Sequence, residues 1–241
     1  KKVVDKNDEI GVPPEKPKYT LKRIWLSKEE ENGYYYGFSN KAIWPLCHIT
    51  YTRPVFDEYD WKHYVEVNKR FADAILKKVG RKKAFVWIHD YHLALLAKFL
   101  KAGNPNIKIA HFWHVPWPNP EAFRICPKKK EILEGLLASD LMGFHILYFC
   151  RNFLETINLE LEARVDNERT SVIYGGHETL VRGFPISVDF EELSKLADSK
   201  RVAKEEQKLR EELSLNRTEF MIMGMDRIDY TKGILEKMTA I

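Results

Sequence analysis

The chain of 241 residues has few cysteines, and they follow no metal-binding or redox spacing. Cys47, Cys126 and Cys150 form no C-x-x-C pair, and any disulfide scheme leaves one of them unpaired. This pattern argues against a secreted disulfide framework, so a reducing, cytoplasmic compartment is the expectation.

Long apolar runs and strong charge blocks are also missing. No stretch approaches the roughly 20 apolar residues of a membrane-spanning helix, and the charged N-terminus has no apolar signal-peptide core. The net charge of +4 is small, and lysines and arginines are spread over stretches such as residues 200–210. We therefore expect no membrane and no nucleic acid as partner. Because the chain lacks an initiator Met and stops inside an apparent helix, we expect it to be a piece of a longer protein.

Two short apolar runs form the centre of the pattern. Residues 84–88 and 107–112 are rich in β-branched and aromatic residues and have the length of buried strands. Between them, apolar residues recur at helical spacing from Leu93 to Leu100, and a Gly-Asn-Pro sequence then stops the helix. This order predicts two neighbouring parallel strands, both buried.

Polar side chains follow both of these strands. The first strand runs into His89 and Asp90, and the second runs into His114. Ligands of open α/β sheets bind outside the carboxyl ends of strands, so these ends make a candidate site. Two structural alternatives stay open, in which Asp90 caps the following helix or His114 is a core histidine.

The segment of residues 34–48 is unusually aromatic for a connection. It is too apolar for an ordinary loop, while its glycines, serine and asparagine argue against a long strand. We expect a loop or short helix that lines a cleft, with core packing as the alternative.

The rest of the chain is interpreted as an irregular lead-in, followed by alternating strands and helices and a hairpin turn. The expected irregular lead-in is residues 1–18, the further strands are 19–27, 141–145 and 180–189, the helices are 60–79, 131–137 and 146–159, and the turn is at 175–177.

Residues near the C-terminus form a new unit in this interpretation. A charged helical connection at 191–217 precedes a fresh strand at 220–224 and a helix that starts near Lys232. A helix start binds anions. Arg227 and, five residues later, Lys232 would add two cations, which predicts a phosphate or diphosphate clamp. The alternative is a structural ion pair of Arg227 with a neighbouring aspartate.

Several other kinds of site have no signature in the sequence. It contains no Walker A or G-x-G-x-x-G loop, no zinc-ligand spacing and no serine nucleophile elbow. A carboxylate, a histidine, aromatic faces and a cationic clamp remain. This set suits transfer from a phosphate-activated donor bound between two α/β halves.

Six sequence blocks, taken together, resemble one family. In chain order they are YGFSNKAIWP, WIHDYHL, HFWHVPWPNPEAFR, SDLMGFH, GFPISVD and MDRIDYTKGI. Their order and intervals are similar to those of the trehalose-6-phosphate synthases, glycosyltransferase family 20. The similarity runs from about residue 34 to the end of the chain.

The resemblance implies an α/β GT-B glycosyltransferase fold. Residues 1–190 would be a Rossmann-like acceptor-side domain without its first elements, 191–217 a helical connection, and 218–241 the start of a Rossmann-like nucleotide-sugar domain. The implied reaction is retaining glucosyl transfer from a nucleotide-glucose, typically UDP-glucose, to glucose 6-phosphate, with no cofactor and no metal. These small molecules would be the partners, and a homo-oligomer stays open.

Residue roles follow from the same resemblance. Tyr36 and Trp44 correspond to residues that hold the sugar-phosphate acceptor, and Asp90 to the carboxylate that bonds acceptor hydroxyls. His114 corresponds to the histidine beside the donor glucose.

The resemblance also covers the predicted cations and leaves two other activities open. Arg227 and Lys232 correspond to the donor diphosphate clamp, and no protein nucleophile is implied. The block from His111 to Pro127 departs from the usual pattern, which leaves glucosylglycerol-phosphate synthesis from ADP-glucose and glycerol 3-phosphate open. A non-catalytic sugar-phosphate sensor is the other alternative, and the chain alone is expected to be inactive.

Overall fold

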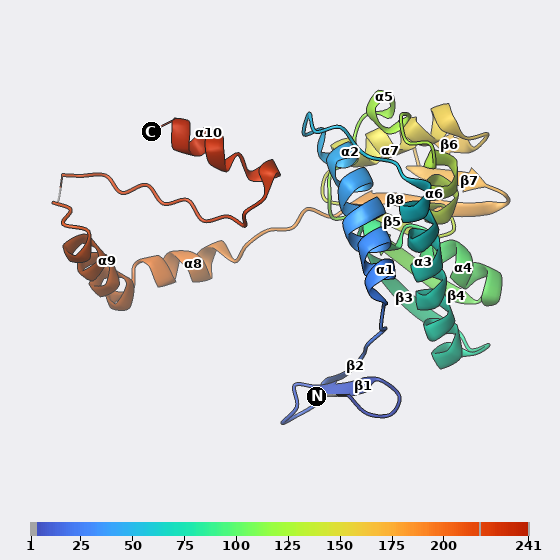
Figure 1. The fold of residues 1–241 in the computed structure, drawn as a ribbon, viewed down its shortest axis with the longest axis horizontal. Helices are drawn as coiled ribbons and strands as arrows, with labels where there is room; N and C mark the ends of the chain where they lie inside the picture. Colours follow the sequence, from blue (N-terminus) through green and yellow to red (C-terminus); the bar gives the residue numbers. More distant parts are fainter. Residues whose placement is uncertain (1–3, 217, 241) are drawn as a thin grey trace. The chain divides into compact units, whose positions relative to one another are not determined.

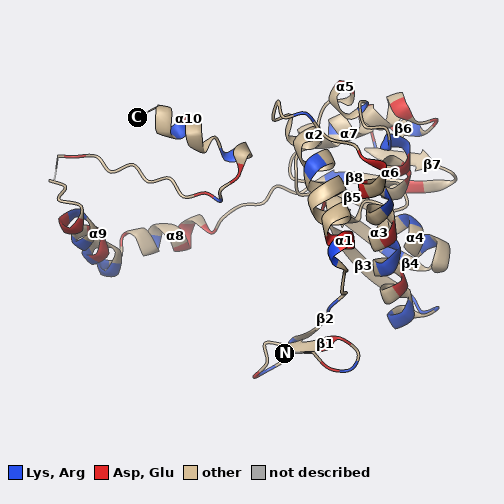
Figure 2. Cartoon of the chain, viewed as in Figure 1, with Lys and Arg blue, Asp and Glu red and all other residues tan. Residues whose placement is uncertain are grey.

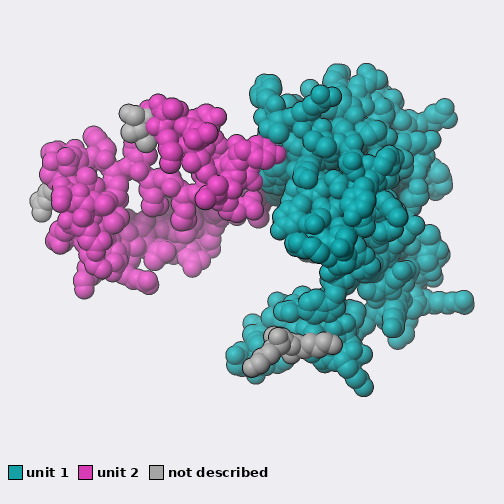
Figure 3. Space-filling model, viewed as in Figure 1, with its two compact units in different colours: residues 1–185 teal, residues 186–241 magenta. Residues whose placement is uncertain are grey.

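The computed structural model describes residues 4–216 and 218–240 and divides the chain into two compact units (Figures 1 and 3). Unit 1 comprises residues 1–185 and unit 2 comprises residues 186–241. Each unit is described by itself.

Unit 1 is built on a six-stranded sheet of order β3-β4-β5-β8-β7-β6 (Figure 1). The first four strands in this order are parallel, and β7 and β6 continue the sheet in antiparallel pairing. The predicted parallel pair is therefore confirmed. The bounds of the strands are β3 Ala84–His89, β4 Ile107–Phe112, β5 Leu141–Phe144, β6 Arg164–Asp166, β7 Ser171–Tyr174 and β8 His177–Gly183.

Helices pack around this sheet, and the four longer ones agree with the predicted helices to within a few residues, whereas the short helices at 91–93 and 120–123 were not predicted. The longest helix, α3, begins after Asp57, whose side chain accepts the backbone N–H groups of Tyr59 and Asp60. It ends at Gly80, which has φ 62°. The bounds are α3 Glu58–Val79, η2 Tyr91–Leu93, α4 Leu96–Gly103, α5 Pro120–Phe123, α6 Lys129–Leu136 and α7 Leu147–Glu160.

Strand β3 is not buried on both faces, so this part of the prediction is wrong. It pairs with β4 alone and forms one edge of the sheet. Val86 and Ile88 pack in the cluster that α3 and α4 complete, whereas Phe85 and Trp87 on the other face are 68% and 60% exposed. An apolar run predicts a strand, but its place in the sheet depends on partners distant in sequence.

The aromatic segment is helical and longer than predicted. A short α1 (Lys28–Glu30) leads into a π-helix η1 (Glu31–Ile43) and then α2 (Trp44–His48). The π-helical pattern is shown by the backbone N–H of Trp44, which donates to the carbonyl of Ser39. A Cβ at Gly33 would meet the His63 ring at 2.7 Å, so the glycine lets η1 approach α3 closely.

The N-terminal part differs from the expected irregular lead-in. β1 (Glu9–Val12) pairs antiparallel with β2 (Tyr19–Lys22), and β2 is shorter than the predicted strand of residues 19–27. The predicted hairpin turn is confirmed between β7 and β8, where Gly175 and Gly176 have φ 56° and 80°. Strand β8 ends at Gly183 rather than continuing to 189.

Unit 2 is mostly helical. The predicted charged helices are present, and Figure 2 shows both signs of charge interleaved along α9, where Arg210 and Glu206 form an ion pair. The predicted strand at residues 220–224 is wrong. The described residues of unit 2 include no strand that could pair with it, and a lone strand leaves its backbone groups unbonded. The bounds are α8 Phe190–Ala197, α9 Lys200–Glu212, η3 Tyr230–Lys232 and α10 Ile234–Thr239.

An ion-pair cluster at Asp140 links β4, β5 and α4. The carboxylate accepts hydrogen bonds from Lys101 Nζ at 2.8 Å, Lys108 Nζ at 2.9 Å and the Ile109 backbone N–H at 2.8 Å. Partial burial raises the pKa of Asp140, but these hydrogen bonds outweigh it and hold the pKa at about 2.

We expect Asp140→Asn to lower the free energy of unfolding by about 1–2 kcal/mol at pH 7. Because the folded pKa lies below the unfolded one, the stabilisation is present above pH ~4 and is lost as the pH falls through about 2. Urea unfolding at several pH values checks this, with Asp73→Asn on the exposed face of α3 as control. A difference that did not shrink in acid would contradict the assignment.

Candidate functional site

Asp90 lies where β3 ends, and its backbone is tied to β4. Its N–H donates to the Phe112 carbonyl at 2.7 Å, and its carbonyl lies 3.0 Å from His111 Nε2. Its φ of 69° with ψ of 175° is a strained conformation for a residue other than glycine. Strain of this kind persists only where surrounding bonds hold it, and here the two strand ends do so.

The side chain of Asp90 makes two further hydrogen bonds. Oδ1 accepts the backbone N–H of Tyr91 at 2.9 Å and that of His114 at 3.2 Å. The helix-cap alternative is therefore correct in part, because Asp90 caps η2. Within the part of the chain that the structure describes, both bonds go to Oδ1, which leaves Oδ2 for a ligand.

His114 is exposed and is not a core histidine. Its Nε2 lies 2.8 Å from Nδ1 of His89, and the two ring planes are inclined at 29° to each other. Partial burial lowers the pKa of His114, with a further lowering by His89 and His145, while Asp90 acts in the opposite direction. The buried core histidine is His111, whose pKa burial lowers to about 4.

Aromatic rings form a wall beside Asp90. The Trp44 and Tyr91 rings lie 5.9 Å apart, and Tyr91 stacks on His92 with centroids 4.0 Å apart. The Tyr91 hydroxyl donates to Asn40 Oδ1 at 3.0 Å. The structure thus places Trp44 beside the residue that follows Asp90.

Tyr36 contacts these aromatic rings only through its neighbour Tyr35 in the described part of the chain. Its ring meets Tyr35 edge-on at 5.2 Å, and Lys28 Nζ lies 5.7 Å from its centroid. Tyr35 instead stacks on His92 at 5.4 Å with an interplanar angle of 10°. Sequence reasoning missed Tyr35, since neighbouring tyrosines can be told apart only by the phase of the helix that carries them.

The two predicted cations lie in unit 2. Asp229 accepts the backbone N–H of Thr231 at 2.9 Å, and Asp226 forms an ion pair with Lys237. Both neighbouring aspartates thus have other partners, and no ion pair of Arg227 is found among residues 218–240. Lys232 ends η3, and α10 begins after Gly233. Asp90 and His114 belong to unit 1. The two cations and this pair of residues therefore lie in different units, each of which is described by itself.

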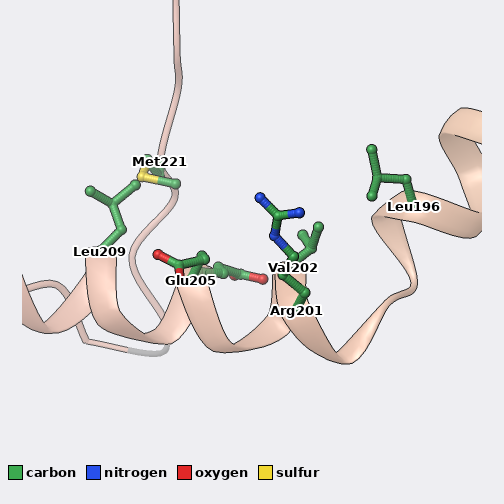
Figure 4. Close-up of a pocket in the computed structure, with 7 residues that line it drawn as sticks. Leu196, Arg201, Val202, Glu205, Leu209 and Met221 are labelled. Carbon is green, nitrogen blue, oxygen red and sulfur yellow. The ribbon is translucent and has the colours of Figure 1, made fainter.

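Unit 2 also contains an open hollow of about 510 Å³ on one side of α8 and α9 (Figure 4). Neither Arg227 nor Lys232 lines it. The lining residues are Leu196, Arg201, Val202, Glu205, Glu206, Leu209 and Met221.

Two kinds of feature are absent from the described residues. Among residues 4–216 and 218–240, no three or more His, Cys, Asp or Glu side chains are grouped so as to hold a metal ion. In the same ranges, no helix has the length and apolar character needed to cross a membrane.

The chain has a mostly parallel sheet with a carboxylate, a histidine and aromatic rings at its strand ends, the place where open α/β sheets generally bind their ligands. The chain has the α/β fold of the GT-B glycosyltransferases, which solved trehalose-phosphate synthase structures share. It belongs to glycosyltransferase family 20, whose family model matches residues 2–241.

Individual relatives agree with this family. The UDP-forming alpha,alpha-trehalose-phosphate synthase of Pichia angusta is 37% identical over 230 residues, which are 93% of this chain and 47% of that protein. A trehalose-phosphate synthase structure from Burkholderia xenovorans in complex with glucose 6-phosphate has a TM-score of 0.81 at 30% identity, covering 92% of this chain and 48% of that one. The N-terminal domain of Candida albicans trehalose-6-phosphate phosphatase has a TM-score of 0.67 at 31% identity, covering 78% and 40%. The chain thus spans about half the length of the curated relatives it matches.

Proposed function

We propose that the whole protein transfers glucose from UDP-glucose to glucose 6-phosphate with retention of configuration and forms trehalose 6-phosphate. Residues 1–190 would supply the acceptor side, 191–217 the connection, and 218–241 the start of the donor side. The observation that carries the proposal is Asp90, held at the strand end with both hydrogen bonds on Oδ1, with His114 bonded to it and with Trp44 beside the neighbouring Tyr91. The similar structure from Burkholderia xenovorans contains glucose 6-phosphate.

The site chemistry suits a sugar acceptor. A carboxylate oxygen accepts hydrogen bonds from sugar hydroxyls, and aromatic faces pack against the apolar side of a sugar ring. Trp44, and Tyr36 or Tyr35, would provide these faces, while Asp90 would orient the attacking hydroxyl.

The transfer step needs no protein nucleophile in this proposal. A bond forms between the acceptor oxygen and the anomeric carbon, and the bond from that carbon to the diphosphate oxygen breaks. The acceptor hydroxyl proton passes to the departing phosphate oxygen. Arg227 and Lys232 would stabilise the negative charge of the leaving group, and His114 would lie beside the donor glucose.

We further propose that the reaction uses no metal or other cofactor, because the two cations supply the positive charge. The substrates are small molecules. The protein works in the cytoplasm, which agrees with three buried cysteines that form no disulfide.

A non-catalytic sugar-phosphate sensor is the second candidate. It is favoured by the likeness to the N-terminal domain of a phosphatase, which shows that this fold also occurs in a protein with another named activity. Asp90, Arg227 and Lys232 are all present in this chain, and this supports the transferase.

An assay of the whole protein tests the proposal. UDP-, ADP- and GDP-glucose are each combined with glucose 6-phosphate or glycerol 3-phosphate, with and without a chelator, and nucleoside diphosphate and sugar product are measured. UDP release that requires glucose 6-phosphate, with trehalose 6-phosphate as product, is the expected result. Turnover only with glycerol 3-phosphate, or glucose 6-phosphate binding without turnover, would each overturn it in favour of one alternative.

The tyrosine that contacts the acceptor can be identified by paired variants. Because Tyr35 stacks on His92 beside Tyr91, we expect Tyr35→Ala to raise the KM for glucose 6-phosphate about tenfold. Tyr36→Ala is the matched control, and a larger effect there would restore the assignment made from the sequence. Steady-state kinetics with varied glucose 6-phosphate provides the measurement.

A further inference from the structure

The geometry points to a role for His89 that the proposed function does not assign. We propose that His89 is a positioning residue, which fixes the ring orientation and the tautomer of His114 through one hydrogen bond between the two imidazoles. The His89 Nδ1 to His114 Nε2 distance of 2.8 Å is that of a well-formed hydrogen bond.

Both histidines are attached to rigid strand ends. His89 is the last residue of β3 and is paired in register with Phe112 of β4. The His114 backbone is held by its N–H bond to Asp90 Oδ1. The Trp87 ring packs against the His89 ring, with their centroids 4.7 Å apart. The pair is therefore built into the sheet rather than carried by a flexible loop.

The hydrogen bond to His89 determines whether the second ring nitrogen of His114 can donate or accept a hydrogen bond. One of the two bonded nitrogens must carry the hydrogen and the other must offer its lone pair, so both rings cannot be protonated at once in this contact. If His89 Nδ1 donates, His114 carries its own hydrogen on Nδ1, and if His114 Nε2 donates, His114 Nδ1 is an acceptor. In both cases Nδ1 is the nitrogen of His114 left for a ligand, and His89 decides whether it donates or accepts.

Other titratable groups facing the pair do not replace this contact. Asp90 bonds the backbone of His114, and His111 bonds the backbone carbonyl of Asp90. His145 meets the His114 ring edge-on with centroids 5.7 Å apart, and no hydrogen bond joins the two rings in the described part of the chain. His89 is therefore the side chain to which the His114 tautomer is coupled.

Two substitutions separate the hydrogen bond from the ring. His89→Phe keeps the ring shape and removes the nitrogen, whereas His89→Asn places an amide near the position of Nδ1. Partners that orient metal-bound histidines change affinity or activity roughly 10- to 100-fold, and we take the lower end of this range for His89. The kinetic test of these two variants rests on the proposed function. We expect His89→Phe to lower kcat about tenfold and His89→Asn to restore most of this loss. The KM for glucose 6-phosphate should change little in either variant. Equal kcat in all three proteins would overturn the proposal.

A second measurement does not depend on activity. Ring ¹⁵N chemical shifts of His114, in whole protein labelled with ¹⁵N-histidine, report the tautomer directly. We expect one tautomer in the wild type and in the control His145→Phe, and a mixture in His89→Phe. An unchanged His114 tautomer in His89→Phe would overturn the proposal. If the wild type transferred no glucose with any donor, the proposed function would fail while this measurement still decided the role of His89.

Discussion

Arg227→Ala in the whole protein is expected to lower kcat at least about a hundredfold, with a small change in the KM for glucose 6-phosphate. Removing one preorganised charge that stabilises the transition state typically costs ~3 kcal/mol. Both neighbouring aspartates have other partners, so little folding energy should depend on Arg227. Steady-state kinetics and the midpoint of thermal unfolding together measure the two effects.

Two controls refine the interpretation. Arg227→Lys keeps the charge but loses the planar guanidinium group that can bind two phosphate oxygens at once, and we expect an intermediate loss of about tenfold. Lys204→Ala removes a cation from the exposed surface of α9 and should leave kcat unchanged. Near-normal turnover of Arg227→Ala would refute the diphosphate clamp.

The sequence predicted the parallel strand pair because that signal is local. Two apolar runs with a helix between them leave little freedom in topology, and β3, α4 and β4 follow accordingly. What a strand packs against is a non-local property, so the exposure of Phe85 and Trp87 was not predictable from the same run. The missing strand at residues 220–224 has a similar origin, since an apolar pattern forms a strand only beside a partner.

From the sequence, the candidate site could be assigned to the carboxyl ends of β3 and β4. The rule that ligands bind at the carboxyl ends of strands placed Asp90 and His114 together, and the structure confirms their contact. The contact between His89 and His114 depends on the register of β3 against β4, and the choice between Tyr35 and Tyr36 depends on the phase of a π-helix. Residue spacing alone predicts neither the register of the strands nor the phase of the helix. These two features could therefore be identified only from the structure.

Asp90→Asn separates the two roles of Asp90, and a large loss of activity with little loss of stability is expected. The asparagine carbonyl oxygen can accept the same N–H groups of Tyr91 and His114, and asparagine tolerates positive φ better than most residues. The charge that would orient the acceptor hydroxyl is lost. We expect kcat to fall about 100-fold, equivalent to about 2.7 kcal/mol, with a nearly unchanged thermal midpoint.

Asp90→Ala provides the contrast that makes this test decisive. It removes the acceptor for both backbone N–H groups, so we expect the free energy of unfolding to fall by about 1–3 kcal/mol in addition to the loss of activity. If Asp90 acted only as a helix cap, Asp90→Asn would turn over almost normally and only Asp90→Ala would be impaired. An active Asp90→Asn would therefore remove Asp90 from the site, whereas an inactive but stable one would show that the carboxylate charge acts on the substrate.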